Sequence, residues 1–185
     1  MVLSRKYTGT WVPLILAVLS SVAVVDQISK VIVLNALEPG VPTPILGEWV
    51  RLLLVFNPGA AFSLGTEFTW VFTCIQLFFV GAVLIMAPGV SDRGIAWGLA
   101  LIAGGAAGNL IDRLFRPPQF FLGHVVDFIS VQGFAVFNIA DSAITIGTGI
   151  TVIALLVEGR NSPLAHTDAA SSPENSAYQG GDSDE

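Results

Sequence analysis

The chain has 185 residues, of which 53% are hydrophobic and only 12% are charged. Soluble domains carry about 25% charged residues, so this composition excludes an ordinary soluble globule and favours a chain that lies in a bilayer. The eight Lys and Arg residues are scattered along the chain. This excludes the basic surface that nucleic-acid binding requires, and we expect no nucleic-acid partner.

The net charge of −6 comes mainly from the C-terminus. Five carboxylates lie in residues 161–185 and account for all but one of the net negative charges. This segment is rich in Pro, Ser, Asn and Gly and has too few large apolar residues to offset the entropy lost on ordering. We expect residues 161–185 to be a disordered acidic tail and residues 1–160 to be one membrane domain.

Cysteine and histidine offer little metal chemistry. Cys74 is the single cysteine, which excludes an intrachain disulfide, and it lies in an apolar run where a thiol behaves as a small hydrophobe. His166 falls in the tail, and His124 has no second His at helical spacing. We therefore expect neither a metal nor a cofactor.

Four apolar stretches are long enough to cross a hydrocarbon core, which takes about 20 residues on a helix. Helix-breaking or charged residues follow each of them, including Arg113 after the third. The first stretch is too long for a secretory signal and lacks an Ala-x-Ala site, so we expect it to remain in the mature protein. The predicted helices are 11–34, 68–87, 94–111 and 134–157.

Four helices place both termini on one side of the membrane. The Lys and Arg residues near the helix ends divide four against three between the two sides, with Arg5 and Lys6 carrying most weight. This predicts cytoplasmic termini. The two longer connections, 38–67 and 112–133, then face the exterior.

The two longer connections differ in their residue types. Residues 49–56 are rich in β-forming side chains and are followed by Asn57-Pro-Gly, which predicts a strand resting on the membrane. The second connection contains helix breakers and aromatic residues that we expect to anchor it at the headgroup level. Its aromatic residues are Phe115, Phe120, Phe121 and Phe128.

Several polar side chains occur where a membrane makes them costly. Asp26 and Lys30 stand four apart on the first predicted helix, so each can neutralise the other. A second polar cluster ends the third predicted helix, after small residues that allow close helix packing. That cluster contains Asn109, Asp112, Arg113 and Arg116, and the small residues are Gly104, Gly105 and Gly108.

Asp127 and Asp141 both stand among apolar neighbours near the predicted exterior face. Desolvation raises a carboxyl pKa, and a second carboxylate nearby raises one member of the pair further. One protonated and one ionised Asp is the state used by aspartic proteases. The spacing alone leaves open that Asp127 caps a loop turn and that Asp141 only caps the fourth helix.

Five sequence blocks, in order, resemble those of lipoprotein signal peptidase, also called signal peptidase II. Any one block is weak, but five in the same order along a four-helix chain are specific. They cover the chain except the leader and the tail, with no departure inside the blocks. The blocks are DQISK at 26–30, NPGAAFS at 57–63, GAAGNLIDR at 105–113, VVDF at 125–128 and FNIADS at 137–142.

The resemblance implies a bacterial membrane aspartic protease that cuts prolipoproteins before a diacylglyceryl-modified cysteine. It makes Asp127 and Asp141 the catalytic pair and implies a small extracytoplasmic β-cradle. It places four polar residues around a pocket for substrate or for globomycin-type inhibitors, namely Asn57, Asn109, Arg113 and Asn138. It gives Asp26 and Asp112 structural roles in holding Lys30 and Arg113.

Two other classes of function use similar residues. A small transporter or proton conductor would spread its carboxylates through the membrane depth. A non-catalytic assembly factor would use the same residues as structural ion pairs, so that Asp127→Asn would disturb folding more than any reaction.

Overall fold

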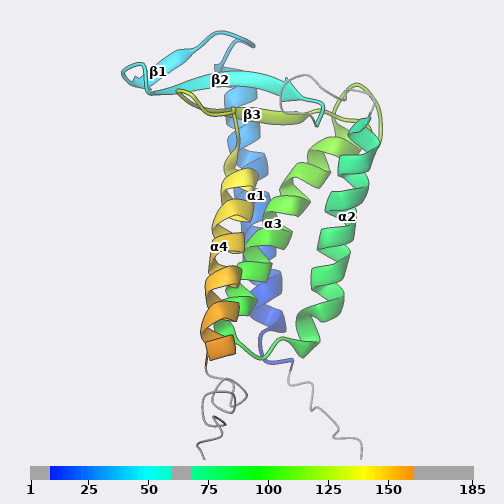
Figure 1. Cartoon of the computed structure of the whole chain (residues 1–185). Coiled ribbons are helices and arrows are strands. Elements are labelled where there is room, and N and C mark those ends of the chain that lie inside the picture. The colour runs from blue at the N-terminus through cyan, green and yellow to red at the C-terminus, as the bar shows by residue number, and fades with distance from the viewer. Residues whose placement is uncertain (1–8, 60–67, 161–185) are drawn as a thin grey trace, which may run out of the picture.

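A computed structural model describes residues 9–59 and 68–160. The tail expected at 161–185 lies outside the described residues, as does the end of the NPGAAFS block. The described residues form four helices that are long and apolar enough to cross a membrane, and one three-stranded sheet. Figure 1 shows the sheet lying across one end of the helix bundle. The predicted fold class is confirmed.

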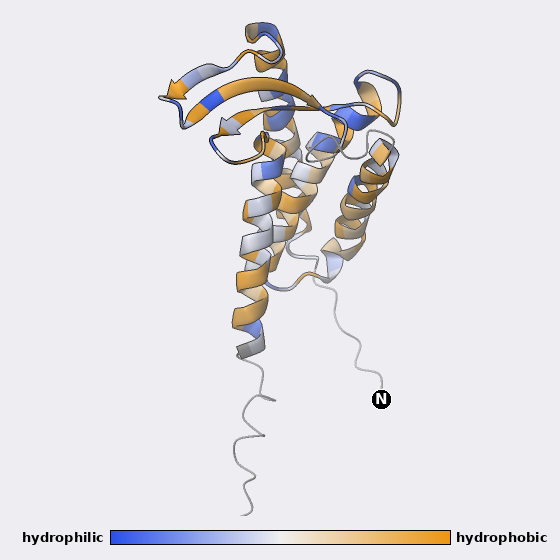
Figure 2. Ribbon diagram, turned by 45° about the horizontal axis from the view of Figure 1, so that its top comes forward, coloured by the Kyte–Doolittle hydropathy of each residue, from blue (hydrophilic) through white to orange (hydrophobic). Residues whose placement is uncertain are grey.

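The first two helices match their predicted bounds closely. Helix α1 spans Val12–Ala36, and α2 spans Thr69–Met86 before the short 3-10 helix η3, Ala87–Gly89. Only 17% of the most apolar stretch of each is buried inside the protein, so their apolar surface faces outward. Figure 2 shows hydrophobic residues along most of the length of the bundle, as expected for helices surrounded by lipid.

Helix α3, Arg93–Phe115, is the central helix and packs against α1, α2 and α4. Its glycines allow these contacts. A Cβ atom at Gly104 would lie 2.8 Å from Cβ of Val22 on α1, and one at Gly105 would press on the backbone carbonyl of Ala140 on α4. The predicted close packing through small residues is confirmed.

Helix α3 ends later than predicted. Residue 111 was the expected end and Arg113 the expected stop, but Arg113 is a buried residue of the last turns. The helix continues until Arg116, whose extended backbone (φ −93°, ψ 161°) precedes Pro117. A residue before proline disfavours the helical region, so Pro117 sets the boundary.

Helix α4, Ile139–Arg160, begins later than the predicted residue 134. Phe137 forms an isolated antiparallel bridge with Ile129, so this part of the apolar run joins the sheet instead of the helix. Figure 1 shows that α1 begins and α4 ends at the end of the bundle opposite the sheet. The polar residues at the start of α4 therefore lie under the sheet.

The sheet is antiparallel, in the order β1-β2-β3. Strand β2, Val50–Asn57, confirms the strand predicted at 49–56, and β1, Thr43–Leu46, precedes it. Strand β3, Val125–Val131, was expected as part of a loop; it forms because it pairs with β2, about 70 residues earlier in the chain.

Strand β3 also changes the place of one aromatic residue. Phe128 was expected at the headgroup level, but it is 5% exposed and packs with Leu54 against Val33 of α1. Phe115 and Phe120 are largely exposed, as expected for residues at a membrane surface. The expectation for Phe128 was wrong because pairing with β2 and packing against α1 bury this part of the strand.

Candidate active site

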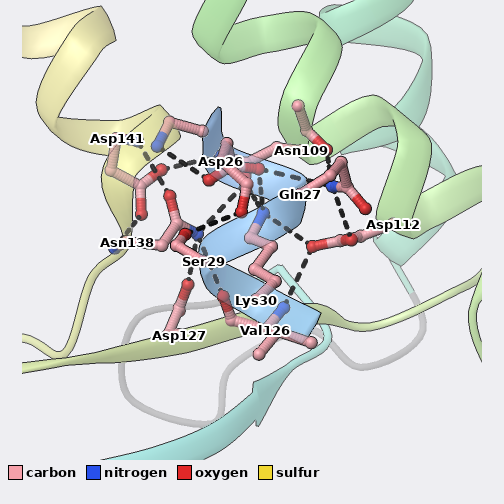
Figure 3. Close-up of polar contacts among 12 residues, drawn as sticks. Asp26, Gln27, Ser29, Lys30, Asn109, Asp112, Val126, Asp127, Asn138 and Asp141 are labelled. Carbon is pink, nitrogen blue, oxygen red and sulfur yellow. Dashed lines mark hydrogen bonds and ion pairs between the residues drawn. The ribbon is translucent and has the colours of Figure 1, made fainter. Parts of the chain in front are cut away.

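The side chains of Asp127 and Asp141 lie near each other, although the two residues belong to different elements. Asp127 lies within β3, opposite Val55 of β2, and Asp141 lies in the first turn of α4. The alternative in which Asp127 caps a loop turn is therefore wrong. Figure 3 shows both side chains at the sheet end of the bundle, with Asn138 between them.

Asn138 caps α4 together with Asp141. The backbone N–H of Asp141 donates to Oδ1 of Asn138 (2.9 Å), and the backbone N–H of Asn138 donates to Oδ2 of Asp141 (3.2 Å). Such reciprocal bonds satisfy two N–H groups at a helix start. Capping thus occurs, as the alternative supposed, but it uses one carboxylate oxygen of Asp141 and leaves the other for Asn109.

The same Asn138 side chain links the carboxylate of Asp127 to the backbone of Asp141. Its Nδ2 donates to Oδ1 of Asp127 (2.7 Å), while its Oδ1 accepts from the backbone of Asp141. Asn138 is fully buried, so this amide is held rigidly. One side chain therefore sets the position of Asp127 relative to the start of α4.

Two further asparagines donate to the pair. Nδ2 of Asn57, at the end of β2, donates to Oδ2 of Asp127 (2.8 Å). Nδ2 of Asn109, on α3, donates to Oδ1 of Asp141 (2.8 Å). Each aspartate therefore accepts from an amide on another element. Three of the four residues that the resemblance places around a substrate pocket contact the pair.

A cluster of buried charged residues on α1 and α3 lies next to the site. Lys30 Nζ lies 2.7 Å from Oδ2 of Asp26 and 2.7 Å from Oδ2 of Asp112, and all three side chains are fully buried. The predicted Asp26–Lys30 pair is confirmed. The cost of burying these charges is offset by mutual pairing.

Asp112 does not hold Arg113 as the resemblance implied. Its Oδ1 pairs with Nε of Arg116 at 2.5 Å, one helical turn further along α3. Its Oδ2 also accepts from the backbone N–H of Val126 in β3 (3.2 Å). Asp112 therefore connects α3 to the strand that carries Asp127. Residues four apart share a helix face, whereas adjacent residues do not.

Gln27 is a member of the cluster to which the sequence analysis assigned no role. Its Nε2 donates to Oδ1 of Asp112 (3.0 Å), and its Oε1 accepts from Nη2 of Arg116 (3.3 Å). Gln27 is part of the first sequence block, and it lies three residues before Lys30. That spacing puts both on one helix face and could have identified it.

Arg113 lies on the other side of α3, toward α2. Its Nη1 donates to the backbone carbonyl of Pro58 (3.4 Å), and its guanidinium carbon lies 5.5 Å from the ring centre of Phe72. The residue is 4% exposed, and its Nε has no hydrogen-bond partner among the described residues. A buried, unpaired donor of this kind is available to a ligand.

The surroundings of Asp127 favour its protonated form. The pKa of Asp127 is raised to about 7; burial is the largest cause, and the nearby carboxylate of Asp141 also raises it. The hydrogen bonds from Asn57 and Asn138 and the charge of Lys30 oppose this rise. A carboxyl group with this pKa carries its proton about half of the time at neutral pH.

The site thus offers one carboxyl group that holds a proton, a second carboxylate beside it and fixed amide donors. Among residues 9–59 and 68–160, no group of three or more His, Cys, Asp or Glu side chains could hold a metal ion. The chemistry that these side chains support by themselves is general acid–base catalysis.

The chain matches the family model described as signal peptidase (SPase) II over residues 18–157. It is 43% identical over 146 residues to the lipoprotein signal peptidase of Mycobacterium avium (strain 104), covering 79% of this chain and 80% of that protein. It is 38% identical over 191 residues to that of Leifsonia xyli subsp. xyli, covering 93% and 88%.

Solved structures agree with this match. A bacterial membrane enzyme determined by the in meso method at 2.3 Å superposes with a TM-score of 0.71 at 27% identity, covering 81% of this chain and 92% of that one. A second, at 1.9 Å, gives 0.67 at 28% identity, covering 78% and 93%. With the family model matched from the first helix to the last, the chain belongs to the signal peptidase II family.

Proposed function

We propose that this protein is an aspartic endopeptidase that removes signal peptides from prolipoproteins, cutting before the diacylglyceryl-modified cysteine. The removal of these signal peptides follows from membership of the family. The observation that supports the aspartic mechanism is the linked pair, in which Asn138 bonds to both Asp127 and Asp141.

In this mechanism the ionised aspartate accepts a proton from a water molecule as the water attacks the scissile carbonyl. The protonated aspartate donates its proton to the carbonyl oxygen, which gives a neutral tetrahedral intermediate. Collapse of the intermediate breaks the C–N bond, and the nitrogen takes up a proton from the dyad. A pKa of about 7 for Asp127 suits a group that must hold a proton at neutral pH.

The four polar residues named from the resemblance are proposed to line the substrate pocket. Asn109 and Asn138 already donate to the dyad, so they border the pocket through the carboxylates that they hold. Arg113, whose Nε is unpaired within the described chain, is the group best suited to donate to a peptide carbonyl. Asn57 lies beside it at the end of β2, and globomycin-type inhibitors would occupy the same pocket.

A lipid-modified substrate sets the depth of the site. Its cysteine is held at the bilayer surface by the acyl chains, so the dyad must lie near a membrane boundary. The dyad lies at the sheet end of the bundle, opposite the start of α1 and the end of α4 (Figure 1). We propose that the sheet end is extracytoplasmic in a bacterial cell membrane and that both termini are cytoplasmic, as the charges of Arg5 and Lys6 favour.

Cleavage of a lipidated peptide is the direct test. Mass spectrometry would follow the purified protein acting on a peptide with a diacylglyceryl-cysteine after its signal sequence. Asp127→Asn and Asp141→Asn should each lower kcat by about 10²- to 10⁴-fold or more, because each removes a proton-transfer group. Asp92→Asn is the matched control, since Asp92 caps the start of α3 through Oδ1 and Asn caps equally well.

The outcomes separate the aspartic protease from the assembly factor. Loss of cleavage in folded Asp127 and Asp141 variants, with the Asp92 variant active, supports the aspartic protease. Cleavage by either dyad variant at the wild-type rate contradicts the mechanism. Loss of folding and activity together in all three variants would return the assembly-factor hypothesis.

A further inference from the structure

The ammonium group of Lys30 has three N–H donors and meets three acceptors. These are Oδ2 of Asp26 (2.7 Å), Oδ2 of Asp112 (2.7 Å) and Oδ1 of Asn109 (2.9 Å). Lys30 is fully buried, so no donor is left for water. Two of these contacts neutralise charge, whereas the third leads toward the dyad (Figure 3).

The third contact orients the Asn109 amide, together with a longer hydrogen bond from Nδ2 of Asn138 to the same oxygen (3.1 Å). An ammonium group can only donate, so the oxygen of the amide must face Lys30 and its NH₂ group must face away. On that side Nδ2 donates to Oδ1 of Asp141 (2.8 Å). Rotating the amide by 180° would point NH₂ at Lys30 and an oxygen at a carboxylate oxygen, and both contacts would be repulsive.

The other two asparagines are oriented by the backbone. Asn57 Oδ1 accepts from the N–H of Gly59 (2.8 Å), and Asn138 Oδ1 accepts from the N–H of Asp141 (2.9 Å). Each of these N–H groups is also an obligate donor, so each NH₂ group is turned toward Asp127. Asn109 differs because a side chain orients it, and a side chain can be replaced without altering the backbone.

The place of Asp141 adds to the effect of this bond. It lies in the first turn of α4, where the helix dipole favours a negative charge, and it accepts from a backbone N–H as well as from Asn109. Asp127 lies in a strand and has no helix terminus of its own. Both aspartates accept two hydrogen bonds, so the position at the start of α4 is what distinguishes Asp141 from Asp127.

We propose that Lys30 is a positioning residue of the dyad, which orients the Asn109 amide so that Asp141 is kept as the ionised carboxylate and Asp127 as the protonated one. In the reaction Asp141 then accepts the proton of water and Asp127 donates to the substrate carbonyl. This inference rests on the proposed function. It goes beyond the structural role that charge pairing alone would give Lys30.

The charged and titratable groups that surround the dyad come from three elements. Helix α1 contributes Asp26 and Lys30, helix α3 contributes Asp112, Arg113 and Arg116, and the segment before β3 contributes His124. Burial and the charge of Arg113 lower the pKa of His124, so it adds no positive charge near neutral pH. Arg116 pairs with Asp112 as Lys30 does, but no contact joins it to Asn109 within the described residues.

Arg116 therefore supplies a control for the loss of a cation beside Asp112. Lys30→Met and Arg116→Met each remove one cation from Asp112, and only the first removes the charged donor to Asn109. The charge of Lys30 also lowers the pKa of Asp127, so a variant of Asn109 that keeps this charge is needed beside it. The measurement is kcat and KM for the lipidated peptide as a function of pH. The rising limb of kcat/KM reports the group that must be ionised, and the falling limb the group that must be protonated.

For Lys30→Met we expect the rising limb of kcat/KM to move to higher pH, because the hydrogen bond that Asn109 donates to the dyad is weakened. We expect kcat to fall about tenfold or more with KM within about threefold, because the effect is on chemistry and not on binding. Arg116→Met should leave the rising limb in place. An equal shift in both variants would assign the effect to charge and overturn the proposal.

Asn109→Leu provides a second route if Lys30→Met fails to fold. It keeps the charge of Lys30, adds no charge and removes the NH₂ group that donates to Asp141, so the rising limb should again move upward. An unchanged limb, or misfolding of both variants, overturns the proposal. If a folded variant is too slow to assay, titration of the dyad carboxyl groups by difference infrared spectroscopy gives the same comparison.

The two proposals can fail separately. If the wild type never cleaves the peptide, or if the dyad variants remain active, the proposed function fails. If the wild type cleaves and both dyad variants are inactive, but Lys30→Met and Asn109→Leu keep the wild-type rising limb, only the role of Lys30 fails.

Discussion

The protonation of Asp127 predicts an unusual effect on stability. Burial raises the pKa of this carboxyl from 3.8 to about 7, and the residue is 2% exposed. The folded state binds this proton more tightly than the unfolded state does. Proton binding therefore contributes fully to the stability of the wild type below about pH 4, and this contribution is lost as the pH rises through about 7. Asn cannot ionise, so Asp127→Asn avoids the loss.

The size of the effect follows from the two pKa values. A rise from 3.8 to about 7 corresponds to about 4 kcal/mol, fully lost at pH 8. The new amide turns its own NH₂ toward the NH₂ of Asn57 or Asn138, and this unfavourable contact lowers the gain in stability by about 1 kcal/mol. The inactive variant should therefore be more stable than the wild type at pH 8 by about 3 kcal/mol, or roughly 5 to 10 °C in Tm.

The assay is thermal unfolding in detergent at about pH 5 and pH 8, with Asp92→Asn as the control at the other end of the bundle. The gap between Asp127→Asn and the wild type should be large at pH 8 and small at pH 5. A variant less stable than the wild type at pH 8, or a gap of the same size at both pH values, would refute the reasoning. A lower stability of Asp127→Asn at pH 8 is also the result expected for an assembly factor.

Three further predictions concern the pH dependence of cleavage, the packing of α3 and the C-terminal segment. The rate of wild-type cleavage should decline as the pH rises through about 7, where Asp127 loses its proton. Asn57→Leu removes a hydrogen bond that lowers the pKa of Asp127, so in a profile of rate against pH the decline should move to higher pH. Gly105→Ala should lower the free energy of unfolding by about 1–3 kcal/mol, because the new Cβ presses on Ala140, whereas Gly149→Ala meets nothing within 4 Å and should not. Truncation after residue 160 should leave peptide cleavage unchanged, and loss of activity in a folded truncated protein would contradict this.

Much of the site could be predicted from the sequence because its signals are local. Long apolar runs determine membrane helices, since a helix satisfies its own backbone hydrogen bonds. Asp26 and Lys30 share a helix face at a spacing of four, and polar residues in apolar runs mark functional positions. The ordered blocks then assigned Asp127 and Asp141 to one pair, which spacing alone left open.

Tertiary structure decided the contacts that depend on distant partners. Strand β3 exists through pairing with β2, so the position of Asp127 within a strand, and the inward turn of Phe128, depend on residues far away in the chain. The partner of Asp112 depends on which face of α3 meets α1, and that face carries Arg116 and not Arg113. Hydrophobic periodicity is read along one element, whereas these choices are made between elements, where close packing selects one arrangement.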